Sequence, residues 1–354
     1  MNRDNFPSLT GVRAIAAYMV FIHHFNPFNV AFFGETIHGF FAEFHIGVTV
    51  FFVLSGFLIA NRYFDVNNFS FKAYFIKRFA RIYPMYFILT TGTFLFWAVF
   101  NNQTNLENLI TYFYNITFLK GFSNDLKFTG ISQSWSLTVE EVFYILAPIF
   151  FLFIKRSKSF LIVLPIVLLG FGCLTVSFFS HFNVSGFMNS IDFMLDFTFF
   201  GRVFEFFIGI GLALFIKNYN TIFNFKHITF ISIVSILTCV YWLSILITPN
   251  GFGTDCLLGK TINTLILPIF GIAPLFFGLI TENTLLSRFL ASKPMLVLGK
   301  SSYIFYLIHM GIFVTIFNKI SENQIFIFVA INCIAVILYS FVEKPINSWI
   351  RKRS

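Results

Sequence analysis

Charged side chains are scarce in this 354-residue sequence, where Asp, Glu, Lys and Arg together make up 11% of the residues. Soluble domains carry about 25% charged residues, whereas 57% of this chain is hydrophobic. These proportions exclude an ordinary water-soluble enzyme or binding module. The apolar runs reach the length of about 20 residues that a helix needs to cross a bilayer, so the sequence predicts an all-α integral membrane protein.

Cysteine is also rare, and its spacing offers no redox or metal motif. The four cysteines are widely separated and none forms a CxxC pattern, so we expect no disulfide and no bound metal. The net charge of +9 would suit nucleic acid in a soluble protein. Here the basic residues lie between apolar runs, as the positive-inside rule requires, and the expected partner is the lipid bilayer, not nucleic acid. The cysteines are Cys173, Cys239, Cys256 and Cys333.

About ten apolar runs have spanning length. The first run has no small-residue cleavage site after it and should therefore remain as a span. Lys and Arg are concentrated in every second segment between the runs, which predicts that both termini are cytoplasmic. The expected spans cover residues 9–25, 44–61, 82–100, 136–154, 160–179, 202–216, 228–247, 262–280, 300–317 and 324–342.

The chain shows no composition shift that would mark a second domain. We expect residues 1–354 to form a single transmembrane domain without an appended soluble domain. The largest outer segments are expected at 101–135, where an interfacial helix over 106–118 is plausible, and at 180–201. No internal repeat is visible, which argues against an inverted-repeat transporter.

The first span carries Arg13 and His24 in the stretch TGVRAIAAYMVFIHHF. Their separation is about three helical turns plus 20°, so both side chains share one face, about 16 Å apart along the axis. His23 points about 100° away from His24. An arginine near a helix end often extends to the headgroups, and a lone histidine is often structural. On one stripe of a membrane helix, however, the two are costly against lipid and favour a functional cavity.

Two further groups of charged residues lie near the ends of expected spans. Arg78 and Arg81 form an RxxR pattern on one helix face. Their guanidinium groups could bind a phosphorylated ligand, although topology alone also places basic residues there. Glu140 and Glu141 lie in SWSLTVEEVFY and point to different faces. A carboxylate in this place could pass protons, pair with an arginine, or lie solvated at the interface.

Polar side chains also occur in two later spans. Arg202 and Glu205 are three residues apart, which favours an intramembrane ion pair of structural importance. Ser302, Tyr306 and His309 follow at the spacing of one helix face. A polar stripe on a span predicts a buried interface or a cavity.

Seven motifs, taken in order along nearly the whole chain, resemble the acyltransferase-3 family of multi-pass membrane acyltransferases. This family includes bacterial O-acetyltransferases of O-antigen, exopolysaccharide and peptidoglycan. The resemblance implies an enzyme of the bacterial cell membrane that takes an acyl group from cytoplasmic acyl-CoA. It delivers this group, which by family precedent is acetyl, to a glycan or glycolipid acceptor at or beyond the outer face. The motifs are LTGVRAIAAYMVFIHH, FFVLSGFLIA, KRFARIYPMY, SWSLTVEEVFY, GRVFEFFIGIG, LGKSSYIFYLIHM and FVEKPI.

The resemblance also implies roles for single residues. It places the family's arginine and histidine on Arg13 and His24, and its glutamate on Glu140. The RxxR pair, with an acyl-CoA role, falls on Arg78 and Arg81. A neutral imidazole near pH 7 can deprotonate a hydroxyl or carry an acyl group, so His24 has two possible roles. Glu140 would orient His24 or relay its proton, and Arg13 would stabilise developing negative charge.

Two other classes of protein compete with the acyltransferase hypothesis. A proton-coupled transporter or flippase of a glycan precursor would use Arg13, His24 and Glu140 as a proton or substrate pathway. It would move its substrate without acyl chemistry and without acyl-CoA. A sensor or structural membrane protein would leave the shared face of Arg13 and His24 unexplained.

Overall fold

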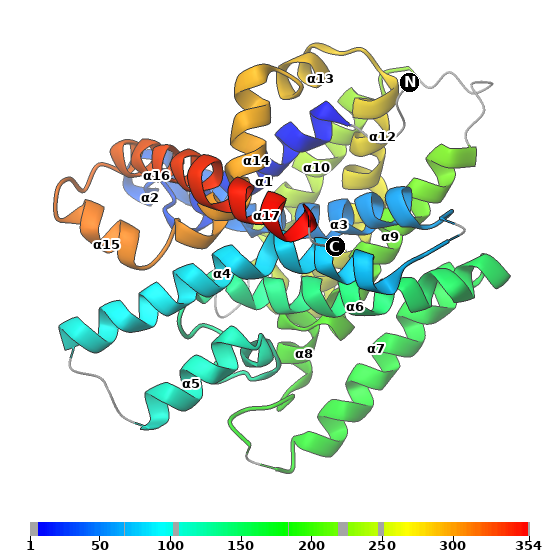
Figure 1. Ribbon diagram of the computed structural model, residues 1–354. Coiled ribbons are helices and arrows are strands. Elements are labelled where there is room, and N and C mark those ends of the chain that lie inside the picture. The colour runs from blue at the N-terminus through cyan, green and yellow to red at the C-terminus, as the bar shows by residue number, and fades with distance from the viewer. Residues whose placement is uncertain are drawn as a thin grey trace. The chain divides into compact units, whose positions relative to one another are not determined.

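The computed structural model of the chain describes residues 6–66, 68–101, 106–182, 184–218, 226–246 and 251–352. In these ranges the chain is helical apart from turns and one isolated β-bridge between Ser123 and Phe187 (Figure 1). The predicted all-α class is therefore confirmed. The α-helices are α1 (Pro7–His24), α2 (Val30–Ala42), α3 (Gly47–Tyr63), α4 (Phe71–Asn101), α5 (Leu106–Ile116), α6 (Trp135–Arg156), α7 (Phe160–Phe179), α8 (Ile191–Phe197), α9 (Phe199–Asn218), α10 (Ile228–Ile245), α11 (Leu257–Thr261), α12 (Ala273–Thr281), α13 (Leu285–Leu290), α14 (Lys293–Ile308), α15 (Ile312–Asn318), α16 (Gln324–Leu338) and α17 (Lys344–Lys352).

Eight helical segments of the described chain are long and apolar enough to cross a membrane, and a ninth is added if α14 and α15 form one bent span. Nine of the ten expected spans coincide with helical segments, and the one at 300–317 falls on the bent pair α14–α15. The expected ten spans exceed the eight or nine found in the described chain. The difference is α1, because Arg13, His23 and His24 lower its mean hydropathy. Residues 1–5 and 353–354 lie outside the described part, and the cytoplasmic location of the termini stays a prediction.

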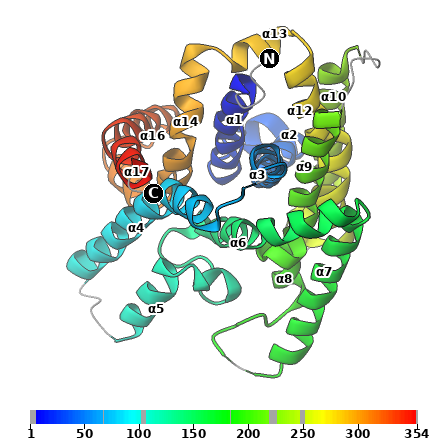
Figure 2. The same ribbon diagram turned by 45° about the vertical axis from the view of Figure 1, so that its right-hand side comes forward.

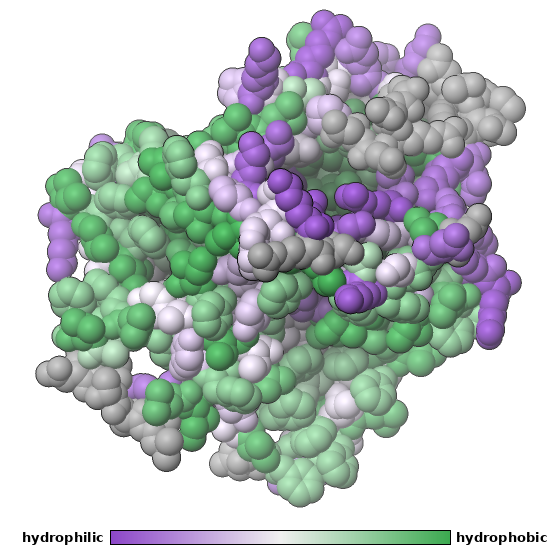
Figure 3. Space-filling model, viewed as in Figure 1, coloured by the Kyte–Doolittle hydropathy of each residue, from purple (hydrophilic) through white to green (hydrophobic). Residues whose placement is uncertain are grey.

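The protein surface is rich in exposed apolar side chains, which suits contact with lipid. Broad hydrophobic areas are visible on the face shown in Figure 3. On α7, for example, Ile166, Leu174 and Phe178 are all more than half exposed. A water-soluble protein would bury such residues because each exposed apolar side chain costs free energy in water.

The chain divides into two compact units, each built from separated stretches of sequence. The first unit comprises Met1–Asp65, Phe153–Ile162 and Val203–Ser302. Within it, α1 packs against α3 and α13, and α10 packs against α2 and α12 (Figures 1 and 2). The side of α1 that faces these neighbours carries the small residues Ala14, Ala16 and Ala17, all fully buried, which lets the helices approach closely.

Glycines bring α3 and α9 into backbone contact in the first unit. A Cβ atom on Gly56 would lie 2.1 Å from the carbonyl oxygen of Phe206, and one on Gly209 would lie 2.1 Å from that of Val53. Neither distance permits a side chain. Small residues at helix crossings are the usual device for close packing in membranes, so the two glycines fix where α3 and α9 cross.

The second unit comprises Val66–Leu152, Val163–Arg202 and Tyr303–Ser354. In this unit α17 packs along α4, and α15 packs against α16 (Figure 2). A separate apolar cluster of Val176, Met188, Phe193 and Met194 holds the end of α7 to α8. The unit therefore has a helical body and a smaller core beneath the segment that joins α7 to α8.

The two expected outer segments contact each other in the second unit. Asn124 donates its backbone N–H to the carbonyl oxygen of Gly186 at 2.9 Å, and Met188 donates to that of Phe122 at 3.0 Å. The segments also contain the helices α5 and α8, so they are more ordered than simple loops. Residues 102–105 and 183 of these segments lie outside the described part.

Candidate active site

Helix α1 ends at His24 and gives its imidazole a defined orientation. Nδ1 of His24 donates to the carbonyl oxygen of Val20, one turn back, at 2.9 Å. In the neutral ring the lone pair then lies on Nε2, which is the nitrogen that can accept a proton or attack a carbonyl. The side chain is exposed.

Arg13 lies three turns before His24 on α1. Its guanidinium carbon is 5.9 Å from the centroid of the Phe51 ring on α3. This is cation–π range, and it holds the arginine against the packed side of the helix. Arg13 therefore lies inside the first unit, half-buried, and does not simply extend into solvent.

His23 is the centre of a cluster that the sequence did not reveal. Its Nδ1 donates to the carbonyl oxygen of Ala42. Its ring centroid lies 4.8 Å from that of His24, 5.3 Å from that of His45 and 5.5 Å from that of Phe252. Three imidazoles from α1 and from the turn before α3 are thereby gathered in the first unit.

His45 has its own acidic partner on the short helix η1 (Glu43–Ile46). Nδ1 of His45 is 3.6 Å from Oε2 of Glu43, and Oε1 of Glu43 accepts the backbone N–H of Gly253 at 2.7 Å. Sequence reasoning missed both residues. The available signal was the Glu-x-His pattern at the start of the expected span 44–61, five residues before the apolar run FFVLSGFLIA.

In the second unit, Arg78 and Glu140 both contact Tyr144. The Tyr144 hydroxyl donates to Oε1 of Glu140, and the guanidinium carbon of Arg78 lies 5.7 Å from the centroid of the Tyr144 ring. Tyr74 reinforces this contact because its hydroxyl donates to the Tyr144 carbonyl oxygen at 2.9 Å. Tyr144 is near the middle of α6, so Arg78 reaches well into the span. Arg81 lies one turn further along α4 and is half-buried.

Tyr306 is the centre of a second polar network in this unit. Its hydroxyl lies 2.8 Å from Oγ of Ser136 and donates to the carbonyl oxygen of Gln133 at 3.1 Å. Nδ1 of the fully buried His309 donates to the Tyr306 carbonyl oxygen at 2.7 Å. The predicted polar stripe is thus buried at this end, as a polar stripe on a membrane helix requires.

The span that carries Tyr306 and His309 is broken directly after them. Helix α15 is bent by 84° from α14, and Gly311 between them has a φ of +81°, a conformation that glycine adopts at little cost. The side-chain amide of Gln133 donates to the carbonyl oxygens of Tyr306 and Leu307 at 2.7 and 2.8 Å. It thereby pairs two carbonyls that the end of α14 leaves without helical partners.

The remaining predicted residues lie on α9 and α14. Nη1 of Arg202 donates to the carbonyl oxygen of Asp196 at 3.3 Å, and Glu205 is fully buried. Their ion pair stays a prediction. Ser302 is buried, and its hydroxyl donates to the carbonyl oxygen of Gly299 at 2.9 Å, which is a contact within its own helix.

The candidate residues are divided between the two units. The first unit brings His23 and His24 together with Glu43 and His45, and it also contains Arg13. The second unit brings Arg78 to Glu140 and contains Arg81, Tyr306 and His309. A single site formed by His24 and Glu140 stays a prediction. In the described residues, no group of three or more His, Cys, Asp or Glu is placed to hold a metal ion.

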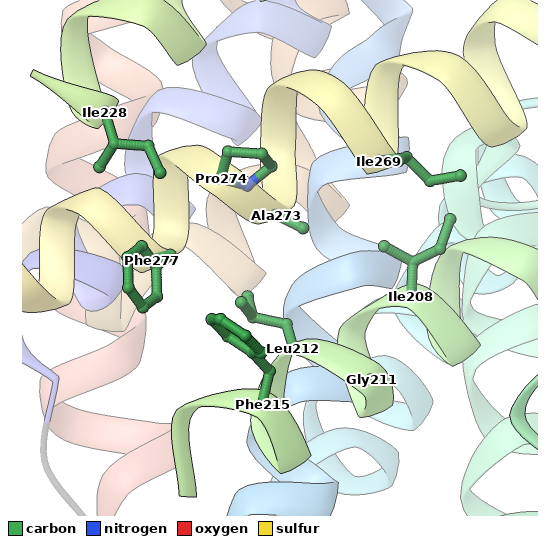
Figure 4. A pocket seen from close by; sticks show the side chains of 9 residues that line it. All are labelled: Ile208, Gly211, Leu212, Phe215, Ile228, Ile269, Ala273, Pro274 and Phe277. Carbon is green, nitrogen blue, oxygen red and sulfur yellow. The ribbon is translucent and has the colours of Figure 1, made fainter. Parts of the chain in front are cut away.

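An apolar pocket of about 360 Å³ lies elsewhere in the first unit, between α9, α10 and α12 (Figure 4). Its lining includes Leu212, Phe215 and Phe277, and no charged side chain takes part. The pocket therefore lacks the acid, base or nucleophile that acyl transfer needs, and the histidine cluster is the better candidate for chemistry.

Comparison with known proteins gives a family match over nearly the whole chain. A model of the acyltransferase domain family matches residues 6–342. The peptidoglycan O-acetyltransferase OatA of Listeria monocytogenes is 27% identical over 375 residues, which cover 98% of this chain and 56% of that protein. The putative peptidoglycan O-acetyltransferase YrhL of Bacillus subtilis is 26% identical, with 97% of this chain and 55% of that protein covered.

The O-acetyltransferase OatA of Staphylococcus aureus is 26% identical over 365 residues, which cover 96% of this chain and 57% of that protein. The chain thus spans little more than half the length of these curated relatives. No solved structure matches the chain significantly.

Proposed function

Because this chain belongs to the acyltransferase domain family, we propose that it is a bacterial membrane O-acetyltransferase that modifies a hydroxyl of a cell-wall glycan or of its lipid-linked precursor. Its multiple apolar helices make it a multi-pass membrane protein. The Listeria relative is named a peptidoglycan O-acetyltransferase and the Bacillus relative a putative one, which makes a peptidoglycan-type glycan the first acceptor to test. Acetyl-CoA is the proposed donor, as the acyltransferase-3 resemblance implies.

The observation that carries this proposal is the orientation of His24. Its Nδ1–H donates to the Val20 carbonyl oxygen, so Nε2 is the basic nitrogen. It is exposed at the end of α1, where a substrate can reach it. An imidazole that is neutral near pH 7 and held in one tautomer is the usual general base for a hydroxyl nucleophile.

As a general base, Nε2 of His24 removes the proton from the acceptor hydroxyl. The hydroxyl oxygen attacks the thioester carbonyl of acetyl-CoA, the C–S bond breaks, and the CoA thiolate takes the proton from the imidazolium to leave as free thiol. As an acyl carrier, Nε2 attacks the thioester carbonyl itself, the C–S bond breaks, and CoA leaves as thiolate. The acceptor hydroxyl then attacks the acyl-imidazolium, the C–N bond breaks to restore the neutral imidazole, and the hydroxyl proton passes to the CoA thiolate. Arg13 would stabilise the oxyanion in either route, and Glu140 would orient His24 or relay its proton.

The first test is acetyl-CoA turnover by the full chain in nanodiscs with a peptidoglycan fragment as acceptor. His24→Ala should lower the release of free CoA thiol and the yield of acetylated glycan by about 10² to 10⁴-fold. The matched control is His227→Ala, because His227 is exposed and lies directly before α10, outside the segments expected to bind the acceptor. If His24→Ala transfers acetyl at the wild-type rate, His24 is not the catalytic group.

A labelled acetyl group separates the two routes. Label that stays on the wild-type protein before the acceptor is added, and is absent from His24→Ala, indicates an acyl-imidazole. Transfer without such an intermediate indicates direct attack by the acceptor.

The proposed CoA contacts are tested by the apparent KM for acetyl-CoA. Arg78→Ala and Arg81→Ala should each raise this KM by about tenfold, since a charge-assisted contact to phosphate contributes roughly 1.5–3 kcal/mol. Arg156→Ala, at the exposed end of α6, is the control. An unchanged KM in Arg78→Ala with a lower kcat would assign Arg78 to the Tyr144–Glu140 pair and not to CoA.

The names of the relatives favour acetylation over the transporter alternative. A flippase would move the glycan precursor in the absence of acetyl-CoA. Release of CoA thiol that depends on both His24 and the glycan would exclude that mechanism as the main activity.

A further inference from the structure

The reaction proposed above leaves one buried acidic group of the histidine cluster without a role. Glu43 is 1% exposed and belongs to η1, which packs against α1 and α3. A carboxylate at this depth is costly unless it is hydrogen-bonded or placed beside a positive charge. The surroundings of Glu43 offer one strong hydrogen bond, from the Gly253 N–H, and one imidazole, that of His45.

The Glu43–His45 pair is continuous with the proposed catalytic histidine. The ring centroids of His45 and His23 are 5.3 Å apart, and those of His23 and His24 are 4.8 Å apart. Both ring pairs meet edge to face, with interplanar angles of 63° and 69°, and Nε2 of His45 lies 3.5 Å from the Thr254 hydroxyl oxygen. A carboxylate, two imidazoles and the His24 ring therefore follow one another within the first unit.

The carboxylate of Glu43 also anchors a loop that packs against the histidine cluster. The short helix η4 (Gly253–Asp255) begins at the residue whose N–H Glu43 accepts. The ring centroid of Phe252, the residue before η4, lies 5.5 Å from that of His23 and 6.4 Å from that of His45. Asp255 closes this loop, because its Oδ2 accepts the backbone N–H of Phe252 at 3.3 Å.

We propose that Glu43 and His45 are positioning residues of acetyl transfer, which stabilise through His23 the imidazolium that forms when His24 takes a proton. This inference rests on the proposed function. Glu43 supplies the negative charge, and His45 and His23 transmit its effect as polarisable rings in edge-to-face contact. Asp, Glu and amide partners of a catalytic imidazole act in this way without being protonated themselves.

The test compares Glu43→Gln with wild type in the nanodisc assay. Glutamine keeps the size of the side chain and the oxygen that accepts the Gly253 N–H, but removes the charge. We expect kcat to fall at least about tenfold, because the imidazolium loses the charge of its carboxylate partner, with the KM for acetyl-CoA and the apparent Tm unchanged. Glu43→Asp should recover part of the loss, and Glu35→Gln on exposed α2 should behave as wild type.

His45→Asn allows a second, independent test by a double-mutant cycle. Because Glu43 acts through His45, the double variant Glu43→Gln/His45→Asn should lose no more activity than the worse of the two single variants. Additive losses would mean that the two residues act separately, which would overturn the proposal.

The outcomes separate this inference from the proposed function. If wild type transfers acetyl and His24→Ala does not, but Glu43→Gln retains the wild-type kcat, only the positioning role is wrong. If Glu43→Gln lowers the apparent Tm while the folded fraction keeps its kcat, Glu43 only anchors the loop at Gly253, and the proposal also fails. If wild type itself transfers no acetyl group to any glycan tested, the proposed function fails and this inference fails with it.

Discussion

Lys120 is the most deeply buried basic side chain of the outer segments and has a clear structural task. It lies in η2 (Leu119–Phe122) and is fully buried. Its Nζ donates to the carbonyl oxygens of Thr129 at 2.6 Å and Ile131 at 2.8 Å. These bonds close the segment that leads into α6. Burial lowers the pKa of the Lys120 ammonium to about 7, because a charge in an apolar site loses its hydration.

The lowered pKa of Lys120 makes the stability of the fold depend on pH, and Lys120→Met should remove this dependence. Between about pH 7 and pH 10, the unfolded chain keeps the Lys120 proton while the folded protein has lost it. The unfolded state therefore binds more protons, and stability must rise with pH across this window. In Lys120→Met that rise should be smaller, and the loss of a donor to two carbonyls should cost about 1–3 kcal/mol.

The measurement is the apparent Tm of the purified protein at pH 7.0 and pH 9.5, with the exposed Lys319→Met as control. Equal increases in Tm for wild type, Lys120→Met and the control would show that Lys120 does not titrate in this range.

Single residues were predictable from sequence where helical spacing decides their position. Arg13 and His24 are both on α1, and the i, i+4 spacing within α6 explains why Tyr144 reaches Glu140. Glu43 and His45 were not predictable as site residues, because their importance depends on a loop near Gly253 that is distant in sequence. Helical periodicity carries no information about such tertiary contacts.

At the scale of elements, the broken span α14–α15 is the feature that hydropathy could not reveal. The residues around the break, YLIHMGIF, are almost all apolar, so the run reads as one span. The break depends on Gly311 and on Gln133, a residue from the turn before α6. The positions of the other expected spans agree with helices, because length and apolar composition are enough to define a helix that crosses lipid.

Gln133→Leu should weaken the end of α14. The variant removes both amide donors. The Tyr306 carbonyl oxygen keeps the Nδ1–H of His309, but nothing in an apolar interior replaces the donor to the Leu307 carbonyl oxygen. Each unpaired buried carbonyl costs about 1–3 kcal/mol, so we expect an apparent Tm several degrees lower. Gln133→Glu should be at least as harmful, since a carboxylate faces the same carbonyls without an N–H.

The matched control is Gln324→Leu, at the start of α16, which changes the same side chain at a different helix end. If Gln133→Leu and Gln324→Leu have the same Tm as wild type, the amide of Gln133 does not support the break. Loss of acetyl transfer in Gln133→Leu at an unchanged Tm would instead indicate that the broken span serves the reaction.

At the scale of the whole molecule, the chain passes repeatedly between two units, and four helices (α6, α7, α9 and α14) belong partly to each. Sequence reasoning expected one domain, because composition is uniform along the chain and gives no sign of internal division. It did locate two long connections, at 101–135 and 180–201, and the structure joins them through the Ser123–Phe187 bridge; their outer location stays a prediction. We expect these joined segments to act together in acceptor selection.

Orientation in the membrane decides whether the proposed donor can reach the chain at all. The positive-inside rule places Ser157, beside Lys155, Arg156 and Lys158, in the cytoplasm and Asp125 on the outer side, with α6 as the span between them. Both side chains are exposed. We expect Asp125→Cys, in a variant whose four natural cysteines are replaced by serine, to react with a membrane-impermeant maleimide in intact bacterial cells.

Ser157→Cys in the same background should react only after the membrane is permeabilised, and the cysteine-free variant should not react in either state. Because α4 begins on the same side as the end of α6, this result would place the start of α4, and with it the approach to Arg78 and Arg81, on the side where acetyl-CoA is made. The reverse labelling pattern would put the basic segments outside. A cytoplasmic acetyl-CoA could then not bind these arginines, and their proposed role would have to be abandoned even if His24 proved essential.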